Sequence, residues 1–225
     1  LAEFATEKRV FVPIEAIPKR VIDAFLAAED ADFYEHPGVN PLSIARAALQ
    51  NLKNLGKDRR PVGASTITQQ VAKNFLLTNE VSIERKIKEA LLAFRIEKAF
   101  TKERILELYM NEIYLGLGSY GAAAAALNYF DKPLAALTLA EAAYLAALPK
   151  APNNYHPIRK ARAGKGRRDW AITRMLVEGY VDADTAKLAK QSALRVIPRT
   201  ATEFIEADYF VEEVRRELAD RFGED

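Results

Sequence analysis

Apolar residues return with helical spacing along most of the chain, and the first such pattern begins at Pro18. Its apolar side chains recur every three or four positions, as in a helix that buries one face: Val21, Ile22, Phe25 and Leu26. The pattern ends at Ala28, so we expect Glu29 at or just past the C-terminal end of this helix. Upstream, residues 10–14 are β-prone but interrupted by Pro13, which predicts at most a short edge strand or an extended lead-in.

A second, amphipathic helix is predicted from Pro41. Its apolar side carries Leu42, Ala45, Ala48, Leu49, Leu52 and Leu55, and its polar side carries Arg46, Gln50, Lys53 and Lys57. Such a helix can lie in a membrane interface with its leucines among the acyl chains, but an ordinary surface helix gives the same pattern. Both interpretations stay open at this point. The glycines and the proline of residues 56–63 then predict a mobile loop.

The remaining patterns also predict helices. Ser82 is a candidate N-cap for the longest one, whose buried stripe we expect to be Ile87, Ala90, Leu91 and Phe94. Further helices are expected after the cap Thr101, in an alanine-rich segment up to Ala126, and over residues 138–148, 160–178, 182–190 and 204–222, with a linker at 199–203. The chain is therefore predicted to be mainly α.

Composition limits the kinds of site that the chain can build. A chain of 225 residues can form one domain, or one domain with an appendage, without covalent staples. The absence of cysteine excludes disulfides and thiolate metal sites, and two histidines, His36 and His156, argue against a histidine-built zinc site. No apolar run reaches about 18 residues and no signal-peptide layout is present, so the sequence as given predicts no membrane span.

Charge is unevenly distributed behind a net charge of +2. Residues 46–60 hold five cations and one acid, and residues 159–174 hold seven cations and one acid. Residues 203–225 hold nine acids and three arginines. This asymmetry predicts a cationic face or groove and a tail of separate character.

Residues 29–38 bring acids, aromatic rings and a histidine together where the first helical pattern ends. Burial beside aromatic rings raises the pKa of a carboxyl and nearby cations lower it, which is how a general acid or base is tuned. A polar helix terminus closed by Pro37 and Gly38 explains the same residues. This stretch alone leaves both interpretations open.

Residues 63–74 hold more hydroxyl and amide side chains than a helix cap needs. Six of them fall within ten residues, and Lys73 follows one turn into the predicted helix. Hydroxyls, free backbone N–H groups and a lysine can seat a phosphate or a sugar, whereas a solvated capping segment is the alternative.

A third polar group lies at residues 85–89. Arg85 and Glu89 are i,i+4 neighbours flanked by Lys86, and alone such pairs are usually surface salt bridges worth about 0.2 to 0.5 kcal/mol. The three groups together supply two carboxylates and cations suited to an anionic leaving group. They favour sugar transfer from a phosphate-activated donor over hydrolysis.

Four segments also resemble, in order, the motifs of a known family. They are EDADFYEHPG at 29–38, GASTITQQVAKN at 63–74, RKIKE at 85–89 and KERILELYMN at 102–111. These segments are similar to four motifs of peptidoglycan glycosyltransferases, the family 51 domains of class A penicillin-binding proteins. Residues 168–176 resemble a weaker fifth motif, and the resemblance covers residues 9–198.

The resemblance implies a mainly α fold, with a lysozyme-like globular head and a smaller membrane-facing (jaw) lobe. The domain would span residues 1–198 with a mobile, membrane-facing segment at 41–62, and residues 199–225 would begin a linker towards a transpeptidase domain. Neither Ser-x-x-Lys nor Lys-Thr-Gly occurs, so penicillin-binding serine chemistry is absent from this chain. The implied reaction polymerises lipid II into β-1,4-linked glycan with inversion and release of undecaprenyl pyrophosphate.

The resemblance also implies roles for single residues. Glu29 would be the base that deprotonates the 4-hydroxyl of the acceptor, and Glu89 would assist pyrophosphate departure directly, through a cation, or by orienting Lys73 and Arg85. The other implied site residues are Lys73, Arg85 and Lys86 for the donor diphosphate, Ser65, Thr66, Gln69, Gln70 and Asn74 for the sugars, and Asp30, Phe33 and His36 around Glu29. A base must be ionised, and we expect Asp30 and Asp32 to raise the pKa of Glu29 and Lys73 or Arg85 to lower it.

Partners and location follow from the same resemblance. It implies lipid II and growing glycan as substrates, a membrane surface, a transmembrane anchor and a transpeptidase domain in a longer protein, and no nucleic acid. The location would be the outer face of a bacterial cytoplasmic membrane, where moenomycin would bind the domain. The resemblance assigns no cofactor, and a divalent cation, Mg²⁺ or Mn²⁺, stays open as an option.

Two further expectations concern geometry and rival functions. Inverting hydrolases hold their two carboxyls roughly 6.5 to 9.5 Å apart, which leaves room for a water molecule. In this chain a whole acceptor sugar must fit instead, so we expect the carboxyls of Glu29 and Glu89 to be separated by a distance at or beyond the upper end of that range. One rival is a lytic enzyme of the same fold, which needs an acid but no seat for a diphosphate. The other is a non-catalytic scaffold for membrane or partner proteins, which needs no buried acid.

Overall fold

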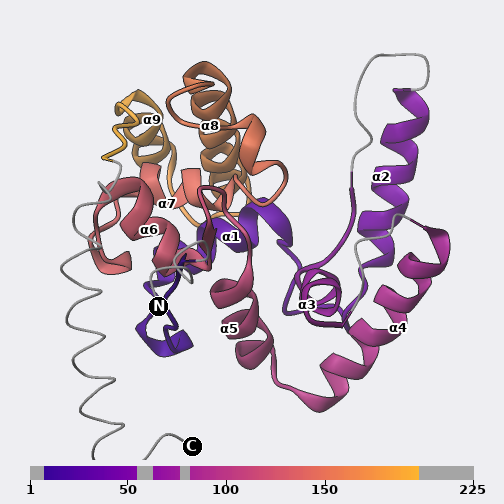
Figure 1. The fold of residues 1–225 in the computed structure, drawn as a ribbon. Coiled ribbons are helices and arrows are strands. Elements are labelled where there is room, and N and C mark those ends of the chain that lie inside the picture. Colours follow the sequence, from indigo (N-terminus) through magenta and orange to yellow (C-terminus); the bar gives the residue numbers. More distant parts are fainter. Residues whose placement is uncertain (1–7, 55–62, 77–81, 198–225) are drawn as a thin grey trace, which may run out of the picture.

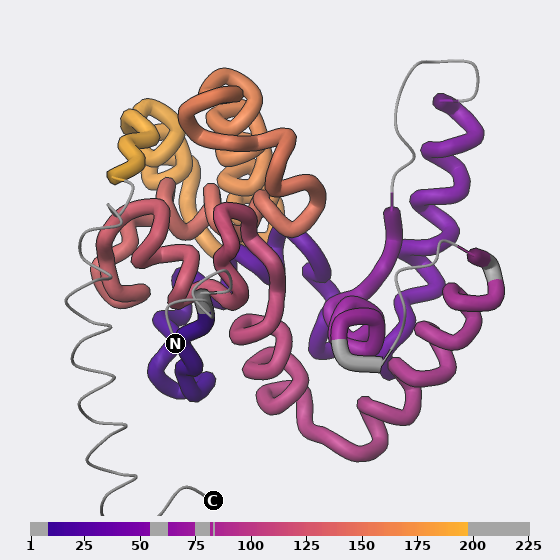
Figure 2. The backbone as a smooth tube through the Cα atoms, in the orientation of Figure 1, coloured from indigo at the N-terminus to yellow at the C-terminus, as the bar shows by residue number. Residues whose placement is uncertain are grey.

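The computed structural model describes residues 8–54, 63–76 and 82–197, which Figure 1 shows in colour, and Figure 2 traces the backbone in the same orientation. Its elements are β1 (Lys8–Arg9), α1 (Lys19–Glu29), α2 (Pro41–Lys53), α3 (Ile67–Leu76), α4 (Ile83–Ala99), α5 (Lys102–Glu112), β2 (Ser119–Tyr120), α6 (Ala122–Phe130), α7 (Leu139–Ala146), α8 (Ala161–Val177) and α9 (Ala183–Gln191). Short 3₁₀ turns lie at Ile14–Ala16, Leu134–Ala136 and Pro152–Asn154.

The prediction of a mainly α chain is confirmed. The predicted linker, the tail helix and all but the last residue of the loop at 56–63 lie outside the described residues.

The helices form two lobes (Figure 1). The larger lobe holds α1 and α5 to α9 around one apolar core, in which α7 packs against both α1 and α8. The smaller lobe holds α2 and α4, and α3 lies between the lobes because it packs against α4 and α5. Ile67 and Val71 of α3 belong to the core of the larger lobe. The site described below lies where these lobes meet.

Helix starts follow the capping residues of the sequence. The side chains of Ser82 and Thr101 accept the backbone N–H groups of Arg85 and Arg104, so both predicted caps are confirmed. At α7, Thr138 and Glu141 form a reciprocal capping box. These bonds satisfy N–H groups that the first turn of a helix leaves without intrahelical partners.

The segment that leads into α1 is fastened to α5. Asn111 accepts the backbone N–H of Val12 and donates to its carbonyl oxygen, and Glu107 accepts the N–H of Ile14. Of the two options predicted for residues 10–14, the extended lead-in is confirmed for residues 10–13, and Ile14 begins a 3₁₀ turn. The strand β1 lies just before this segment and pairs in parallel with β2. Two members of the fourth motif thus hold the chain that enters the larger lobe.

The predicted buried stripe of α4 is wrong. Ile87, Leu91 and Phe94 are 57%, 58% and 41% exposed, while Ala90 is partly buried. The face packed into the molecule instead carries Glu89 and Ala93, at 1% and 0% exposure. At 100° per residue, Ile87 and Leu91 point about 200° away from Glu89 and Ala93 respectively. Periodicity identified an apolar face correctly but could not show that this face lies outside.

α2 likewise exposes most of its apolar face. Leu42, Leu49 and Leu52 are exposed, and Ala47 is its buried residue. Within the described ranges, no helix combines the length and the apolarity needed to cross a bilayer. The smaller lobe therefore presents two helices with solvent-facing apolar side chains.

Candidate active site

A cavity of about 400 Å³ lies at the junction of the two lobes. Its wall is built by the end of α1, by α2, by residues 63–66 and by α8. The lining side chains that the argument uses are Glu29, Asp30, Ser65, Thr66, Trp170 and Arg174. Volumes of about 300 to 1,000 Å³ are usual for small-molecule sites. The sequence-predicted acid thus lies in a cavity of suitable size.

Glu29 is the last residue of α1 and is only partly exposed. Its Oε2 accepts a hydrogen bond of 2.9 Å from the side-chain amide of Gln70. Burial raises the pKa of Glu29 to about 7, against the lowering effects of the Gln70 bond and of the charges of Arg167 and Lys150. Near neutral pH the carboxyl is therefore present in both protonation states.

One expectation about the electrostatics of Glu29 needs a correction. The sequence left the protonation state of Glu29 open, and desolvation is the largest of the effects that bring its pKa to about 7. The cations that lower this pKa are Arg167 and Lys150, which come from α8 and from the segment after α7, rather than Lys73 or Arg85. The charge of Asp30 raises the pKa of Glu29 as expected, but its effect is the smallest of those named.

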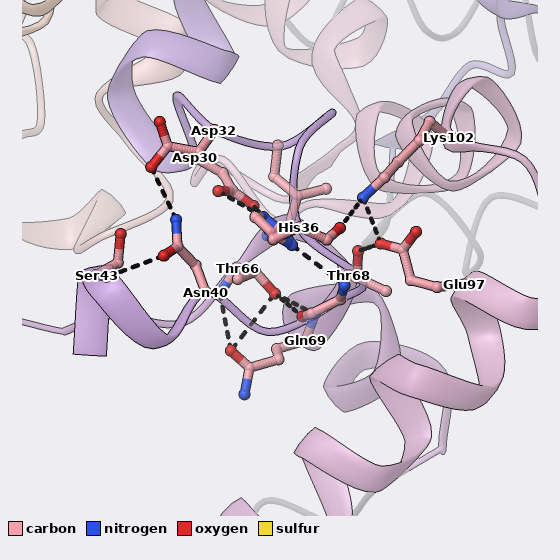
Figure 3. A network of polar contacts seen from close by, with 12 residues as sticks. Asp30, Asp32, His36, Asn40, Ser43, Thr66, Thr68, Gln69, Glu97 and Lys102 are labelled. Atoms are coloured by element: carbon pink, nitrogen blue, oxygen red, sulfur yellow. Dashed lines mark hydrogen bonds and ion pairs between the residues drawn. The ribbon is translucent and has the colours of Figure 1, made fainter. Parts of the chain in front are cut away.

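Asp30 and His36 belong to a network of polar contacts next to Glu29 (Figure 3). Asp30 is buried, and its Oδ2 accepts the backbone N–H of Ile67 at 2.9 Å, which fixes the start of α3 next to the end of α1. The His36 Nε2–H donates to Asp30 at 3.0 Å, while Nδ1 accepts the N–H of Gly38 at 3.2 Å. These bonds require the neutral Nε2–H tautomer. Asp30 lines the cavity, whereas His36 supports it indirectly.

The start of α3 is tied to its surroundings by the hydroxyls that looked excessive in the sequence. Thr66 Oγ1 donates to the carbonyl of Gly38 at 2.5 Å, and Gln69 Oε1 accepts the N–H of Thr66 at 3.0 Å. Thr68 donates to Glu97 of α4 at 2.5 Å. These hydroxyl and amide groups therefore bond α3 to the turn after α1 and to α4. Contacts of Thr66 and Gln69 with a sugar stay a prediction.

Lys102 completes this network. Its Nζ donates to Glu97 at 2.8 Å and to the carbonyl of His36 at 2.7 Å, and it lies 4.4 Å from the ring centre of Phe33. Phe33 is fully buried, so it shapes the surroundings of the acidic stretch from the core. One cation thus joins α4, α5 and the turn after α1.

Glu89 is a buried acid held between two cations, Arg85 and Lys86, whose side chains are 13% and 50% exposed. Arg85 Nη1 donates to Glu89 at 2.6 Å, and Lys86 Nζ donates to Glu89 at 2.5 Å and to Ser65 Oγ at 2.9 Å. Glu89 is 1% exposed, so the interpretation as a solvated surface pair is wrong. Ser65 lines the cavity, and its bond to Lys86 therefore connects this cluster to the cavity wall. Nε of Arg85 is a buried donor without a hydrogen-bond partner in the part of the chain that the structure describes.

Two of the predicted substrate-binding residues lie on the surface of α3 and do not line the cavity. Lys73 and Asn74 are exposed on α3, and their contacts with substrate stay predictions, as does the Glu29–Glu89 separation. In residues 8–54, 63–76 and 82–197, no group of three or more His, Cys, Asp or Glu side chains could hold a metal ion. A divalent cation remains an untested option.

Sequence reasoning missed the contribution of α8. Trp170 and Arg174 line the cavity, and the charges of Arg167 and Lys150 reach Glu29. The cation-rich stretch at 159–174 was the available signal, because it predicted a cationic groove without assigning a residue. Arg168, from the weaker fifth motif, is instead fully buried and donates to the carbonyls of Lys190 and Ser192 at the end of α9.

Fold and cavity together define a mainly α, two-lobed domain with an acid of raised pKa in a cleft, as in glycan-processing proteins of lysozyme-like fold. The family model described as Transglycosylase matches residues 1–176, and the chain belongs to this family. The predicted membership of the peptidoglycan glycosyltransferase domains of class A penicillin-binding proteins is thereby confirmed.

Named relatives agree with this assignment. The chain is 54% identical over 218 residues, 97% of its length, to penicillin-binding protein 1A of Rickettsia felis, and 42% identical over 224 residues to that of Escherichia coli. A crystal structure of penicillin-binding protein 1A from Haemophilus influenzae matches with a TM-score of 0.52 and 28% identity, covering 98% of this chain and 22% of that one. The predicted lysozyme-like fold is confirmed. The chain spans 28% and 26% of the two sequence relatives, so it corresponds to about a quarter of their length.

Proposed function

We propose that this domain polymerises lipid II into β-1,4-linked glycan, with inversion at the donor anomeric carbon and release of undecaprenyl pyrophosphate. The observation that carries the proposal is Glu29, an acid in the cavity whose pKa burial raises to about 7. A general base works best when its pKa lies near the working pH, because both its ionised fraction and its proton affinity are then high.

In the proposed step, ionised Glu29 takes the proton of the acceptor 4-hydroxyl. The hydroxyl oxygen forms a bond to the donor anomeric carbon from the face opposite the diphosphate, and the bond from that carbon to the diphosphate oxygen breaks. The electron pair leaves with the diphosphate, and configuration at the carbon inverts. One carboxylate as base and a separate set of cations for the leaving group are sufficient for this reaction.

The cluster of Arg85, Lys86 and Glu89 supports the second half of the step. Developing charge on a departing diphosphate is stabilised best by cations that are already in place. Glu89 holds both cations through direct bonds, and Nε of Arg85 is a buried donor that has no partner among the described residues. Of the three roles left open for Glu89, these bonds favour orientation of the cations.

A lytic enzyme is the alternative that one observation favours. A carboxyl with a raised pKa in a cleft also suits the general acid that protonates a glycosidic oxygen. Hydrolysis leaves no diphosphate, however, so it gives the Arg85–Lys86 cluster no role in the chemistry. The products therefore separate the two functions: long glycan from lipid II for the synthase, and soluble fragments from finished glycan for the lytic enzyme.

The test incubates labelled lipid II with the protein in detergent and measures glycan length. Glu29→Gln should abolish polymer, and Glu89→Gln should reduce its rate strongly. Glu35→Gln, which changes an exposed acid of the same turn, is the matched control and should keep the parent rate. Polymer formation by Glu29→Gln at the parent rate would remove the assigned base.

Membrane contact through the smaller lobe is part of the proposal. Exposed leucines of α2 and the exposed apolar side of α4 fit an interface with acyl chains, where the lipid part of lipid II lies. Vesicle flotation should weaken when Leu49 and Leu52 are both changed to Ser. Leu188→Ser, at a comparably exposed position of α9 in the larger lobe, is the control and should float like the parent.

By analogy with the longer relatives, we also place the domain in a protein with a membrane anchor and a transpeptidase domain, on the outer face of the bacterial cytoplasmic membrane.

A further inference from the structure

The α8 wall of the cavity has no role in the proton transfer or in the departure of the diphosphate. Trp170 forms part of this wall together with Glu29 and is 38% exposed. Its neighbours Ala171 and Ile172 are fully buried and carry the core-facing side of the helix. Trp170 therefore lies outside the core face, on a surface that is shared with the assigned base.

A cation holds the Trp170 ring in place. The guanidinium carbon of Arg167 lies 3.6 Å from the ring centre, which covers one face of the indole. Arg167 is itself anchored, because its Nε donates to the carbonyl of Ala147 at 3.3 Å and its guanidinium lies 5.8 Å from the ring centre of Tyr155. The indole is therefore fixed before any ligand arrives, which lowers the entropic cost of binding against it.

A fixed and partly exposed indole in a polar cavity suits a sugar ring. A hexopyranose presents C–H groups on a face and hydroxyls around its edge, so it packs flat on an aromatic surface while its edge forms hydrogen bonds. The quadrupole of an aromatic face attracts the weakly positive C–H groups. Other exposed apolar residues of α8, such as Val177 at 66% exposure, lack both the cavity and the stacked cation.

We infer that Trp170, braced by Arg167, is a stacking platform for the acceptor-side N-acetylhexosamine that lies next to Glu29. The side is assigned because Trp170 and Glu29 line one cavity, whereas Arg85, Lys86 and Glu89 do not line it. The identity of the sugar rests on the proposed function. Trp170 acts as a binding and positioning residue, since it has no proton to exchange in the reaction.

The chain offers a direct readout, because Trp170 is its one tryptophan. Intrinsic fluorescence of the Glu29→Gln protein, which prevents turnover, should change saturably with a lipid-free disaccharide of N-acetylglucosamine and N-acetylmuramic acid. The same titration with polyprenyl phosphate in detergent is the comparison, and there we expect no saturable change. A response to the polyprenyl phosphate alone would overturn the inference, because the ring would then contact lipid.

Kinetics supply the second arm. Trp170→Ala should raise the KM for lipid II about tenfold, equivalent to about 1.4 kcal/mol, and leave kcat within about twofold, because stacking acts on ground state and transition state alike. Trp170→Phe keeps an aromatic face and should recover most of the affinity. Val177→Ala, on the same helix but outside the cavity, is the matched control. Circular dichroism shows whether each variant folds.

The outcomes separate this inference from the proposed function. Normal polymerisation with an unchanged KM in Trp170→Ala and no fluorescence response to the disaccharide would overturn the platform alone. A saturable response to the disaccharide without any polymer from lipid II would support the platform and refute the synthase. A loss of kcat in Trp170→Ala with KM unchanged would assign the ring a role other than sugar binding.

Discussion

Replacing Glu29 by Gln should stabilise the folded protein, and the gain should depend on pH. Burial raises the pKa of this carboxyl from 4.5 to about 7, a rise of about 2.5 that corresponds to about 3 kcal/mol at 1.36 kcal/mol per pH unit. Because Glu29 keeps part of its surface in solvent, we expect about 2 kcal/mol of this to be realised. Gln carries no charge to desolvate.

The direction of this pH dependence follows from the protons that the folded and the unfolded chain bind at Glu29. Below pH 4.5 the carboxyl is protonated in both the folded and the unfolded chain, so it imposes no charge-burial cost. Between pH 4.5 and about 7 the unfolded chain releases its proton first, so the free energy of unfolding falls as pH rises. Above pH 7 the folded state bears the whole cost of an ionised, desolvated carboxylate. Glu29→Gln should therefore match the parent near pH 4.5 and exceed it by about 2 kcal/mol near pH 8.

Urea unfolding followed by helical circular dichroism at pH 4.5, 6 and 8 measures this difference. Taking the difference between the two proteins at each pH cancels the titration of the carboxyls that both share. A gain of equal size at all three values, or a gain confined to acid pH, would refute the reasoning. The kinetic counterpart is an acid limb in the pH dependence of kcat/KM with a midpoint near 7, because that ratio reports groups of the free enzyme.

Three other sets of substitutions test single contacts. Gln70→Ala removes the amide that bonds Glu29, so the acid limb should move upward by up to about 1 pH unit, and an unmoved limb would contradict the bond's assigned effect. Arg168→Met leaves the carbonyls at the end of α9 without donors and should lower the free energy of unfolding by about 2 to 4 kcal/mol in urea. Gly121→Ala, at φ 84° with a Cβ 2.5 Å from the backbone of α5, should destabilise by about 2 kcal/mol or more. Gly166→Ala, in the open on α8, should stabilise by about 0.5 to 1 kcal/mol, so equal effects of the two would contradict this placement.

The helical framework could be predicted because its signals are local. Ser82 and Thr101 cap helices at the expected positions, and Glu29 ends α1 where the apolar pattern stops. Each of these features depends on bonds within a few residues, which the sequence displays directly. The buried face of α4 depends instead on which neighbour packs there. α3 and the core select Glu89 and Ala93, although the opposite face is more apolar.

The candidate site could be predicted only in part, for the same reason. Residues 29–38 and 85–89 stand out because acids and bases interrupt apolar patterns. The charges that oppose the rise in the pKa of Glu29 come instead from Lys150 and Arg167, which lie more than a hundred residues away along the chain. No local pattern links such positions, so the sequence could show that the pKa of Glu29 would be perturbed but not which cations oppose the rise.

The surroundings of the two acids divide the work between them. Both oxygens of Glu89 accept bonds from cations, so this carboxylate is committed to holding Arg85 and Lys86. Glu29 accepts one neutral amide bond through Oε2, and burial raises its pKa to about 7, so its carboxyl has a high affinity for a proton near neutral pH. Two carboxyls placed in such different environments suit the two different roles that we propose for them. Gln70→Lys would give Glu29 a cationic partner like those of Glu89 and lower its pKa. The rate of glycan formation from lipid II at neutral pH should therefore fall even though both acids remain, and an unchanged rate would contradict the division of roles.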